Sequence, residues 1–327
     1  MNVDIFLHKL TVVTENILSR RRKKIRIRKE KQQNKNFIVD WLEALLWAAG
    51  VVLLINQYLI QAYQIPSGSM TDTLMIKDHI FVNKLIFGPE ILPGLGKIPS
   101  PFKPQRNEVI IFENPSYISR GPLFDIIQRI LYMVTFSFVD IDREESGEPR
   151  VHFLIKRAIG MPGDTVVLDR GEILIRFAGE KDFIPEREYN RQRAFSHTLS
   201  RLMETHQYPT LEYAGTLSAY QDLKLNPPDL IVEAARPAAN LQYPDYFAYE
   251  KARLQFLQAA NPQENRYRMR LAQLSQGWYI PEGRIFPLGD NRDNSRDARY
   301  FGAVRTAKVL GQGTFIYWPL GRIGLID

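Results

Sequence analysis

Hydrophobic positions along the chain form one long apolar segment followed by many short apolar runs. No side chain between positions 44 and 71 is charged. Residues 41–60 cover about 20 positions, which as a helix matches the hydrocarbon thickness of a bilayer. A buried core helix is the alternative, but no polar stripe interrupts residues 44–55. The pattern therefore predicts one membrane-spanning helix.

A dense basic run precedes this segment. Residues 20–31 hold nine basic side chains and Glu30, a local charge of +8, whereas the whole chain carries +7. The charge is thus a local patch and does not indicate a nucleic-acid-binding domain. Because basic residues stay on the cytoplasmic side, residues 1–36 are expected to form a cytoplasmic tail, residues 37–63 an anchor, and everything beyond Tyr63 to lie outside.

The ends of the predicted anchor carry polar and aromatic side chains. Asn56 and Gln57 are expected to reach lipid headgroups at the outer end. A belt of interfacial aromatics is expected at Trp41, Trp47, Tyr58 and Tyr63. A cleaved secretory signal is the alternative, but the segment lies far from residue 1 and no A-x-A site follows it.

Beyond the anchor the apolar runs are short and alternate with polar positions, as β-strands do. They occupy residues 79–86, 108–113, 151–159, 165–175, 278–288 and 314–318. Asp169-Arg170-Gly171 has the composition of a hairpin turn. The pattern predicts a mostly β fold, an antiparallel and barrel-like sheet divided between residues 64–176 and 278–327.

Two insertions interrupt the strand pattern. Residues 123–138, within an insertion at 121–141, carry apolar side chains at helical spacing, which is typical of a core helix or of a helix lying on a bilayer. Residues 177–277 are polar and helix-like, notably at 186–204, 246–259 and 265–276. They are expected to form a separate appended subdomain of unknown role.

Composition narrows the chemistry. The chain has 327 residues, of which 45% are hydrophobic and 24% charged, as in globular proteins. It has no cysteine, which excludes disulfides, thiolate zinc sites and cysteine nucleophiles. The histidines are scattered without HExxH or HxH spacing, so neither a metal centre nor a histidine triad is predicted: His8, His79, His152, His197 and His206.

A serine nucleophile without histidine needs another base. Ser67 and Ser69 lie where the predicted anchor ends, and the remaining classical base is a lysine made neutral by burial. Its pKa must fall from about 10.4 to roughly 7 to 8. Lys156 is a candidate, because strand alternation places Lys156 and Arg157 on opposite faces. An exposed basic pair on an edge strand is the alternative.

Residues 289–299 form a second dense polar cluster, with Asp and Arg side chains interleaved beside apolar strands. A calcium loop starting at Asp293 would need glycine at its sixth and glutamate at its twelfth position, which are Ala298 and Val304. That interpretation fails. A solvated loop and an internal lattice of ion pairs remain.

Three stretches, in this order after one anchor, resemble the bacterial type I signal peptidases, membrane-anchored Ser/Lys endopeptidases. They are Pro66-Ser67-Gly68-Ser69-Met70 with Thr73-Leu74, Ile155-Lys156-Arg157 with Gly160 and Pro162-Gly163-Asp164, and residues 289–295 with Asp297, Arg299, Tyr300 and Gly302.

The resemblance implies a role for each matching residue. Ser69 resembles the nucleophile and Lys156 the general base, while Ser67 and the Ser69 backbone N–H correspond to the oxyanion hole. Ser295 is expected to orient the lysine by a hydrogen bond, and Asp297 through the surrounding polar network. Structural ion pairs near the site are implied for Asp290, Arg292, Arg299 and Arg157. No metal or other cofactor is implied.

The chain departs from the family pattern at three places beside the dyad. Where the family usually has proline after the nucleophile, this chain has Asp72 within Met70-Thr71-Asp72-Thr73-Leu74. Lys77-Asp78 replaces a usual Gly-Asp pair, and Asn107-Glu108 replaces a later one. These differences bear on substrate fit more than on the chemistry.

The resemblance implies an endopeptidase of the cytoplasmic (inner) membrane that cleaves exported preproteins, with small residues at the first and third positions before the bond. Membrane lipid is the other expected partner, and nucleic acid is not one. A self-cleaving Ser/Lys repressor-type protease is one alternative, which the anchor argues against. A non-enzymatic membrane-tethered β scaffold is the other.

Overall fold

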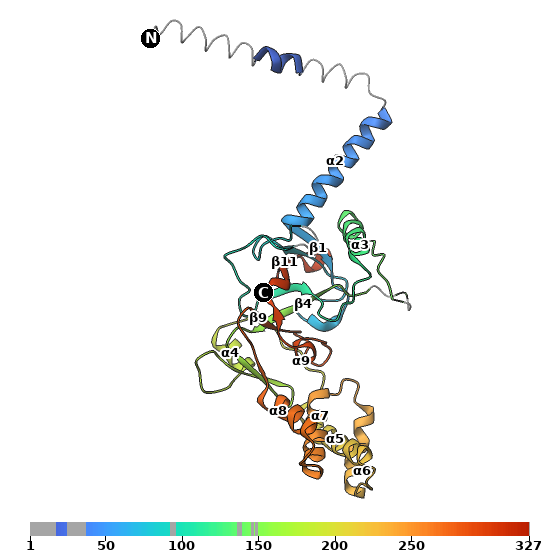
Figure 1. Cartoon of the computed structure of the whole chain (residues 1–327), viewed down its shortest axis with the longest axis vertical. Helices are drawn as coiled ribbons and strands as arrows, with labels where there is room; N and C mark the ends of the chain where they lie inside the picture. Colours follow the sequence, from blue (N-terminus) through green and yellow to red (C-terminus); the bar gives the residue numbers. More distant parts are fainter. Residues whose placement is uncertain are drawn as a thin grey trace. The chain divides into compact units, whose positions relative to one another are not determined.

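The computed structural model describes residues 18–24, 37–91, 96–135, 139–144, 147 and 150–326. The chain divides into two compact units, Met1–Val52 and Leu53–Asp327 (Figure 1). Residues 18–24 are helical. The rest of the expected N-terminal tail, with much of its basic run, lies outside the described residues.

The predicted anchor is helix α2 (Phe37–Tyr58), which is 22 residues long. Within the described ranges it is the one helix long and apolar enough to cross a membrane. The helix ends at Tyr58, earlier than the expected boundary at residue 63, because strand β1 (Ile60–Gln64) pairs in antiparallel register with β2 (His79–Asn83). The chain therefore enters the sheet two residues after leaving the helix.

Three side chains expected at the membrane interface are buried in protein, so that expectation was wrong for them. The side-chain amide of Asn56 donates to the Met133 carbonyl oxygen at 3.4 Å, and that of Gln57 donates to the Glu90 carbonyl oxygen at 2.9 Å. Tyr63 belongs to the core. Hydrogen bonds to the backbone of other segments and packing in the core thus take these side chains away from lipid.

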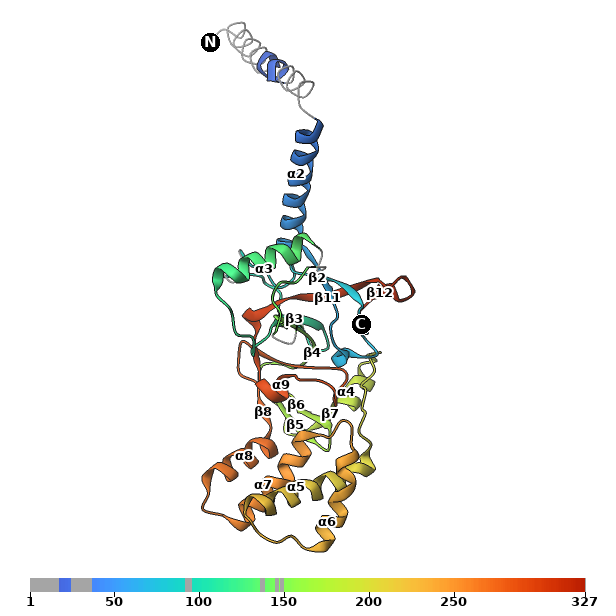
Figure 2. The same ribbon diagram turned by 90° about the vertical axis from the view of Figure 1, so that its right-hand side faces the viewer.

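Two antiparallel sheets form the body of the second unit, which confirms the predicted mostly β fold (Figure 2). The larger sheet has the order β1, β2, β11 (Val309–Trp318), β3 (Val109–Glu113), β4 (Phe153–Gly160), β9 (Arg284–Leu288) and β10 (Val304–Arg305), with β12 (Gly324–Leu325) on β11. The smaller has the order β7 (Ile184–Pro185), β6 (Glu172–Arg176), β5 (Thr165–Asp169) and β8 (Trp278–Tyr279).

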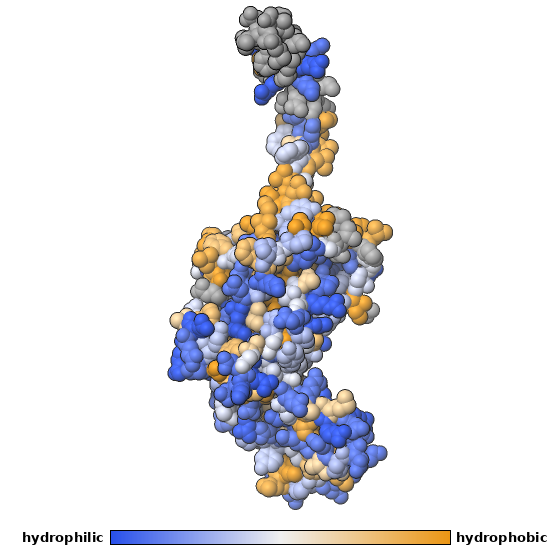
Figure 3. Space-filling model, turned by 60° about the vertical axis from the view of Figure 1, so that its left-hand side comes forward, coloured by the Kyte–Doolittle hydropathy of each residue, from blue (hydrophilic) through white to orange (hydrophobic). Residues whose placement is uncertain are grey.

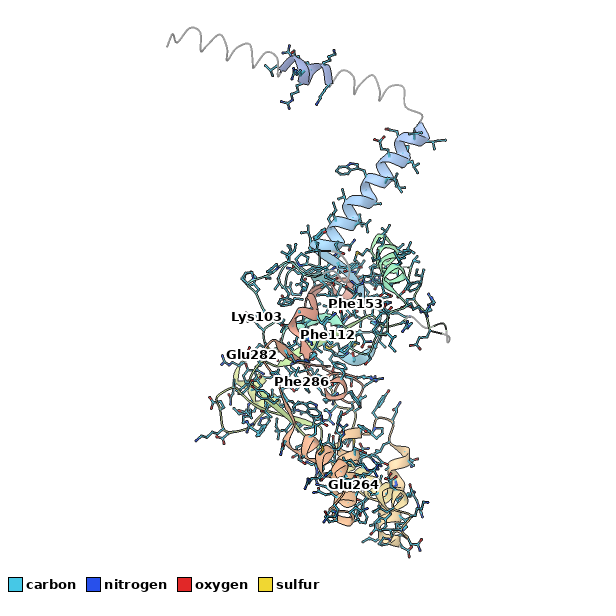
Figure 4. The ribbon with its side chains drawn as sticks, in the orientation of Figure 1. Lys103, Phe112, Phe153, Glu264, Glu282 and Phe286 are labelled. Carbon is cyan, nitrogen blue, oxygen red and sulfur yellow. The ribbon has the colours of Figure 1, made fainter. Side chains whose placement is uncertain are left out.

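The larger sheet brings early and late parts of the second unit together, because the late strand β11 lies between the early strands β2 and β3. Phe112, Phe153 and Phe286, which Figure 4 labels, come from its strands β3, β4 and β9. Two core clusters cover this sheet, one of them around Tyr63, Met70 and neighbouring side chains of β1, β2 and β11.

Helices occupy most of the 177–277 insertion. They are α4 (Glu186–Gln192), α5 (Tyr208–Asp222), α6 (Asp229–Ala235), α7 (Tyr246–Ala260) and α8 (Asn265–Gln276). Side chains of α5, α7 and α8 share one hydrophobic cluster with β5, β6 and β9. The insertion therefore packs on the smaller sheet through a common core.

Helix α3 (Pro122–Val134) occupies the other insertion and does not bury its apolar stripe. Leu123, Ile127 and Ile130 are 79%, 54% and 42% exposed. The core-helix interpretation of this segment was therefore wrong. Residues 136–138 of the expected helix lie outside the described part of the chain.

Positive φ angles occur at several turns, three of which bear on features of the sequence described above. The β5–β6 hairpin turns at Arg170 (φ 45°) and Gly171 (φ 75°), as a two-residue primed turn requires, which confirms that prediction. Lys77 (φ 73°) and Asn107 (φ 71°) hold the same left-handed conformation where the related family usually has glycine. At both departures the backbone thus holds a conformation that glycine adopts readily.

Lys77→Gly is expected to raise the free energy of unfolding by about 1 kcal/mol, because a left-handed non-glycine residue costs roughly that much. Lys77 is exposed. Urea denaturation of the full chain in detergent micelles measures the change. Asn107→Gly is the matched control, in which loss of the buried bond from Asn107 Nδ2 to Asn190 Oδ1 (3.1 Å) offsets the gain. A destabilised Lys77→Gly protein would contradict the backbone argument.

Candidate active site

The two serines lie on a short turn that leaves strand β1. Ser67 is extended (φ −138°, ψ 158°) and exposed, and a single 3₁₀ turn, η1 (Gly68–Met70), follows it. Thr71 Oγ1 donates to the Gly68 carbonyl oxygen at 2.5 Å. Because Met70 is 1% exposed and packs in the core, the turn is fixed from below while Ser67 faces solvent.

Lys156 reaches this turn from strand β4, where it lies opposite Ile110 of β3. Its side chain is buried, and Nζ shares a hydrogen bond with Ser69 Oγ. Burial lowers the pKa of Lys156 to about 8, against the opposing influence of Asp297 and Asp290. The structure thus joins a serine hydroxyl to an amine that gives up its proton near neutral pH.

Arg157 points to the other face of β4 and is equally buried. Its Nε donates to Asp290 Oδ1 at 2.9 Å and its Nη2 to Asp290 Oδ2 at 2.7 Å, while Nη1 donates to the Asn107 carbonyl oxygen at 2.7 Å. Strand β4 lies between β3 and β9. The interpretation of Lys156 and Arg157 as an exposed pair on an edge strand was therefore wrong.

Residues 289–299 form a buried lattice, so the solvated-loop interpretation was also wrong. Arg299 binds the Asp297 carboxylate through Nε at 2.8 Å and Nη2 at 2.9 Å. Although burial alone would raise the pKa of Asp297, Arg299 holds it below its usual value. Asn291 donates its backbone N–H to the Ser69 carbonyl oxygen at 3.1 Å. The lattice thereby touches the serine turn directly.

Gly289 and Ser295 pack against the backbone of Ser69. A Cβ on Gly289 would lie 2.2 Å from Ser295 Oγ and 2.5 Å from the Ser69 carbonyl oxygen, so only glycine fits there. Ser295 Oγ is buried, and no bond from it to Lys156 appears among the hydrogen bonds of the described residues. Its orienting role for Lys156 stays a prediction, whereas Asp297 acts on Lys156 through its charge.

Ser67 Oγ lies on the same side of the turn as the Ser69 hydroxyl, 3.4 Å from Ser69 Oγ. Gly68 lies between the two serines, and there is little space for a side chain at its position. A Cβ there would lie 3.0 Å from Thr71 Oγ1. The turn itself, besides any approach of a substrate, therefore favours glycine.

Glu186, at the start of insertion helix α4, was not singled out by the sequence. Its carboxylate accepts from Arg292 Nη1 at 2.5 Å and Nη2 at 2.8 Å, and both side chains are 2% exposed. Matching each carboxylate of residues 289–299 with an arginine would have indicated that a partner is missing. Asp290 is taken by Arg157 and Asp297 by Arg299, so a buried Arg292 needs a carboxylate from elsewhere.

Ser200, also in the insertion, contacts both the segment that follows the serine turn and the 289–299 lattice. Its backbone N–H donates to the Asp290 carbonyl oxygen at 3.0 Å, and its carbonyl accepts from the Arg292 N–H at 3.1 Å. Its hydroxyl donates to the Asp72 carboxylate. Asp72 has φ 79°, which proline at about −65° does not adopt. The missing family proline is thus explained by a different turn, tied to the insertion.

Metal ligands do not gather in this region. Within the part of the chain that the structure describes, no group of three or more His, Asp or Glu side chains is arranged to hold an ion.

Comparison with known proteins adds an independent line. The profile of the family described as signal peptidase, peptidase S26, matches residues 38–318. The chain belongs to this family. Its members include proteases that remove signal peptides, and the matched range contains the serine turn, β4 and the 289–299 lattice.

Curated relatives agree with the family. Signal peptidase I of Haemophilus influenzae is 28% identical over 86% of this chain and 72% of its own length. Signal peptidase I of Aquifex aeolicus is 26% identical over 82% of this chain and 79% of its own length. A crystal structure of a signal peptidase I from Enterococcus faecalis is 19% identical, covering 65% of this chain and 97% of its own, with a TM-score of 0.25.

Asp72→Pro, which restores the usual family residue, is expected to destabilise the protein by more than about 1 kcal/mol, because the native φ of Asp72 is positive. Thermal unfolding measures the loss. Asp72→Asn is the matched control, since asparagine tolerates the left-handed region and still bonds Ser200. Equal stability of the two variants would mean that the turn adapts to proline at no cost.

Proposed function

We propose that this chain is a membrane-anchored signal peptidase I that cleaves preproteins with a Ser69–Lys156 dyad. The observation that carries the proposal is the hydrogen bond between Lys156 Nζ and Ser69 Oγ in a buried setting that lowers the pKa of Lys156 to about 8. A serine becomes a useful nucleophile when an adjacent neutral base takes its proton.

In the first half of the reaction the Ser69 hydroxyl donates its proton to neutral Lys156. The alkoxide oxygen attacks the scissile carbonyl carbon and forms a tetrahedral intermediate. Lys156, now an ammonium, returns the proton to the departing amine as the C–N bond breaks. The product is an ester between the signal peptide and Ser69, and the mature protein leaves with a new N-terminus.

The oxyanion of the intermediate is held by the Ser69 backbone N–H and by the hydroxyl of Ser67. Ser67 Oγ lies 3.4 Å from Ser69 Oγ on an exposed part of the turn, where a substrate carbonyl has access to both. One such donor contributes about 3 kcal/mol to lowering the barrier.

In the second half Lys156 acts as base toward water. A water molecule gives its proton to Nζ and attacks the ester carbon, and the proton then passes to Ser69 as the ester bond breaks. Asp290 and Asp297 stay ionised nearby, because Arg157 and Arg299 hold the pKa of each carboxyl low against the effect of burial. Ser295 and Asp297 keep the Lys156 side chain oriented.

Helix α2 anchors the enzyme in the cytoplasmic membrane, in contact with lipid. Its length and composition suit one crossing. The basic residues at 20–31 keep the N-terminus in the cytoplasm, so everything beyond the anchor, from Gln64 onward, lies on the outer side. Substrates are exported preproteins with small residues at the first and third positions before the cleaved bond.

Ser69→Ala and Lys156→Arg are each expected to abolish preprotein cleavage in detergent, because the first lacks the nucleophile and guanidinium does not deprotonate at working pH. Gel assays of precursor and mature product measure it. Lys308→Arg is the conservative control, since Lys308 is exposed and bonds Glu113. Substantial cleavage by Lys156→Arg would refute the base assignment. No cleavage by the wild type would favour a scaffold.

Cleavage by the wild type is expected to rise with pH through a midpoint near 8, because only the neutral form of Lys156 accepts the Ser69 proton. A second buried lysine, Lys84, also has a pKa lowered by burial to about 8. Lys84→Met therefore serves as the control, and its pH profile should keep the same midpoint. A shifted midpoint in Lys84→Met would mean that the pH dependence reports Lys84 and not Lys156.

Specificity and orientation are tested on the membrane-bound enzyme. Replacing a small residue with leucine at either the first or the third position before the bond is expected to reduce cleavage strongly, whereas the same change at the second position should not. In spheroplasts, external protease should digest the part of the chain beyond Tyr63 and spare the N-terminal tail. If only protease on the cytoplasmic side digested this part of the chain, the orientation would be the opposite of the one proposed.

A further inference from the structure

Helix α3 exposes its apolar face, whereas a helix that packs on a core buries that face. Its apolar side chains at positions 123, 126, 127, 130 and 131 recur at helical spacing and are between 37% and 79% exposed. A surface helix in a water-soluble domain turns such a stripe inward. The stripe here faces away from the protein.

The opposite face of α3 faces the rest of the unit: Tyr132 packs against the core beside Tyr63, Met133 is buried, and several polar side chains bond neighbouring segments. Gln128 is 4% exposed, and its amide donates to Asp140 at 3.0 Å. Arg129 binds Glu90 at 3.0 Å and lies over the ring of Phe153. Asp125 accepts bonds from neighbouring hydroxyl groups. These hydrogen bonds and the ion pair fix the rotation of α3 about its axis, so that the apolar stripe points outward.

The C-terminal end of α3 lies beside the point where the spanning helix enters this unit. Asn56 donates to the carbonyl oxygen of Met133 at 3.4 Å. Glu90 connects the same two elements, since its backbone carbonyl accepts from Gln57 at 2.9 Å and its carboxylate binds Arg129. Further exposed apolar side chains belong to this end of the unit: Leu54, Ile55, Leu59, Ile60 and Leu85.

Apolar surface gathers at this end of the unit in Figure 3, whereas the end that carries the helical insertion is mainly hydrophilic. An apolar surface that adjoins the outer end of a membrane span has the headgroup region of that membrane within reach. With 13 residues and the charged Asp125 and Arg129, α3 is too short and too polar to span a bilayer.

We propose that α3 lies flat in the outer interface of the membrane, with its stripe of Leu123, Ile126, Ile127, Ile130 and Leu131 inserted among lipid headgroups and upper acyl chains. The inference rests on the proposed anchoring by α2. It adds a second point of attachment, which restrains rotation of the catalytic unit about the end of the span. The serine turn is then held at a set height and orientation above the lipid.

The absence of cysteine from the chain makes the test direct, because each introduced cysteine is the single thiol available for a nitroxide label. Leu123→Cys, Ile127→Cys and Ile130→Cys full-length proteins are reconstituted in phosphatidylethanolamine–phosphatidylglycerol vesicles. Collisions of the label with oxygen, which partitions into lipid, are compared with collisions with a water-soluble nickel chelate. The matched control is Leu230→Cys on α6, because Leu230 is also an exposed helical leucine, at 72% against 79% for Leu123 (Figure 2).

The oxygen-to-nickel ratio is expected to be several-fold higher at the three α3 positions than at position 230. A ratio equal to that of the control would place α3 in water and overturn the proposal. Labels shielded from both reagents would also overturn it, in favour of a contact with another protein or a second copy of the chain.

Two further measurements separate this inference from the proposed function. A label at Leu45→Cys in α2 reports whether the span itself lies in lipid, and cleavage of a preprotein by each labelled protein reports the enzymatic activity. Lipid contact at position 45 and normal cleavage, together with water contact at positions 123, 127 and 130, would refute the role of α3 alone. Water contact at position 45 would refute the anchor instead.

Discussion

Two aspartates lie close enough to Lys156 to raise its pKa, and arginines occupy both of them. This arrangement is the constraint on which the site depends, because a carboxylate paired directly with Lys156 would keep the lysine protonated. Arg157 holds Asp290 from the far face of β4, and Arg299 holds Asp297 within the lattice. The ion pairs therefore remove competing acceptors, and burial is left to favour the neutral amine.

Much of the fold was predictable because its signals are local, whereas the site residues followed from the resemblance of three distant stretches to one family. Alternation along β4 reports which side chains share a face, so it separated Lys156 from Arg157, and a turn dipeptide marked the β5–β6 hairpin. Partners that come from distant segments leave no such local signal. Neither Glu186 nor the end of α2 at Tyr58 followed from periodicity, since both depend on how the chain packs around the sheet. The side chain of Asn56 looks like an interfacial one until its acceptor is known.

Departures from the family motif do not all mean the same thing. At positions 77 and 107 another residue stands where the family usually has glycine, yet the backbone holds a left-handed conformation that suits glycine. At position 72 the proline is gone and the turn itself differs, because Asp72 adopts a φ that proline excludes and bonds Ser200 instead. The sequence alone does not distinguish these three changes. The backbone angles do, because positions 77 and 107 have a φ that suits the usual glycine, whereas position 72 has a φ that excludes the usual proline.

The ion pair between Glu186 and Arg292 bears on how freely the helical insertion can vary. The carboxylate belongs to the first residue of α4, while the guanidinium also donates to the carbonyl oxygen of Gly289, which packs against Ser69. Deleting the insertion would strand a charged group in the interior, at a cost of several kcal/mol. The insertion is thus no detachable module. Any replacement or shortening of the insertion that removes Glu186 therefore requires a matching change at position 292.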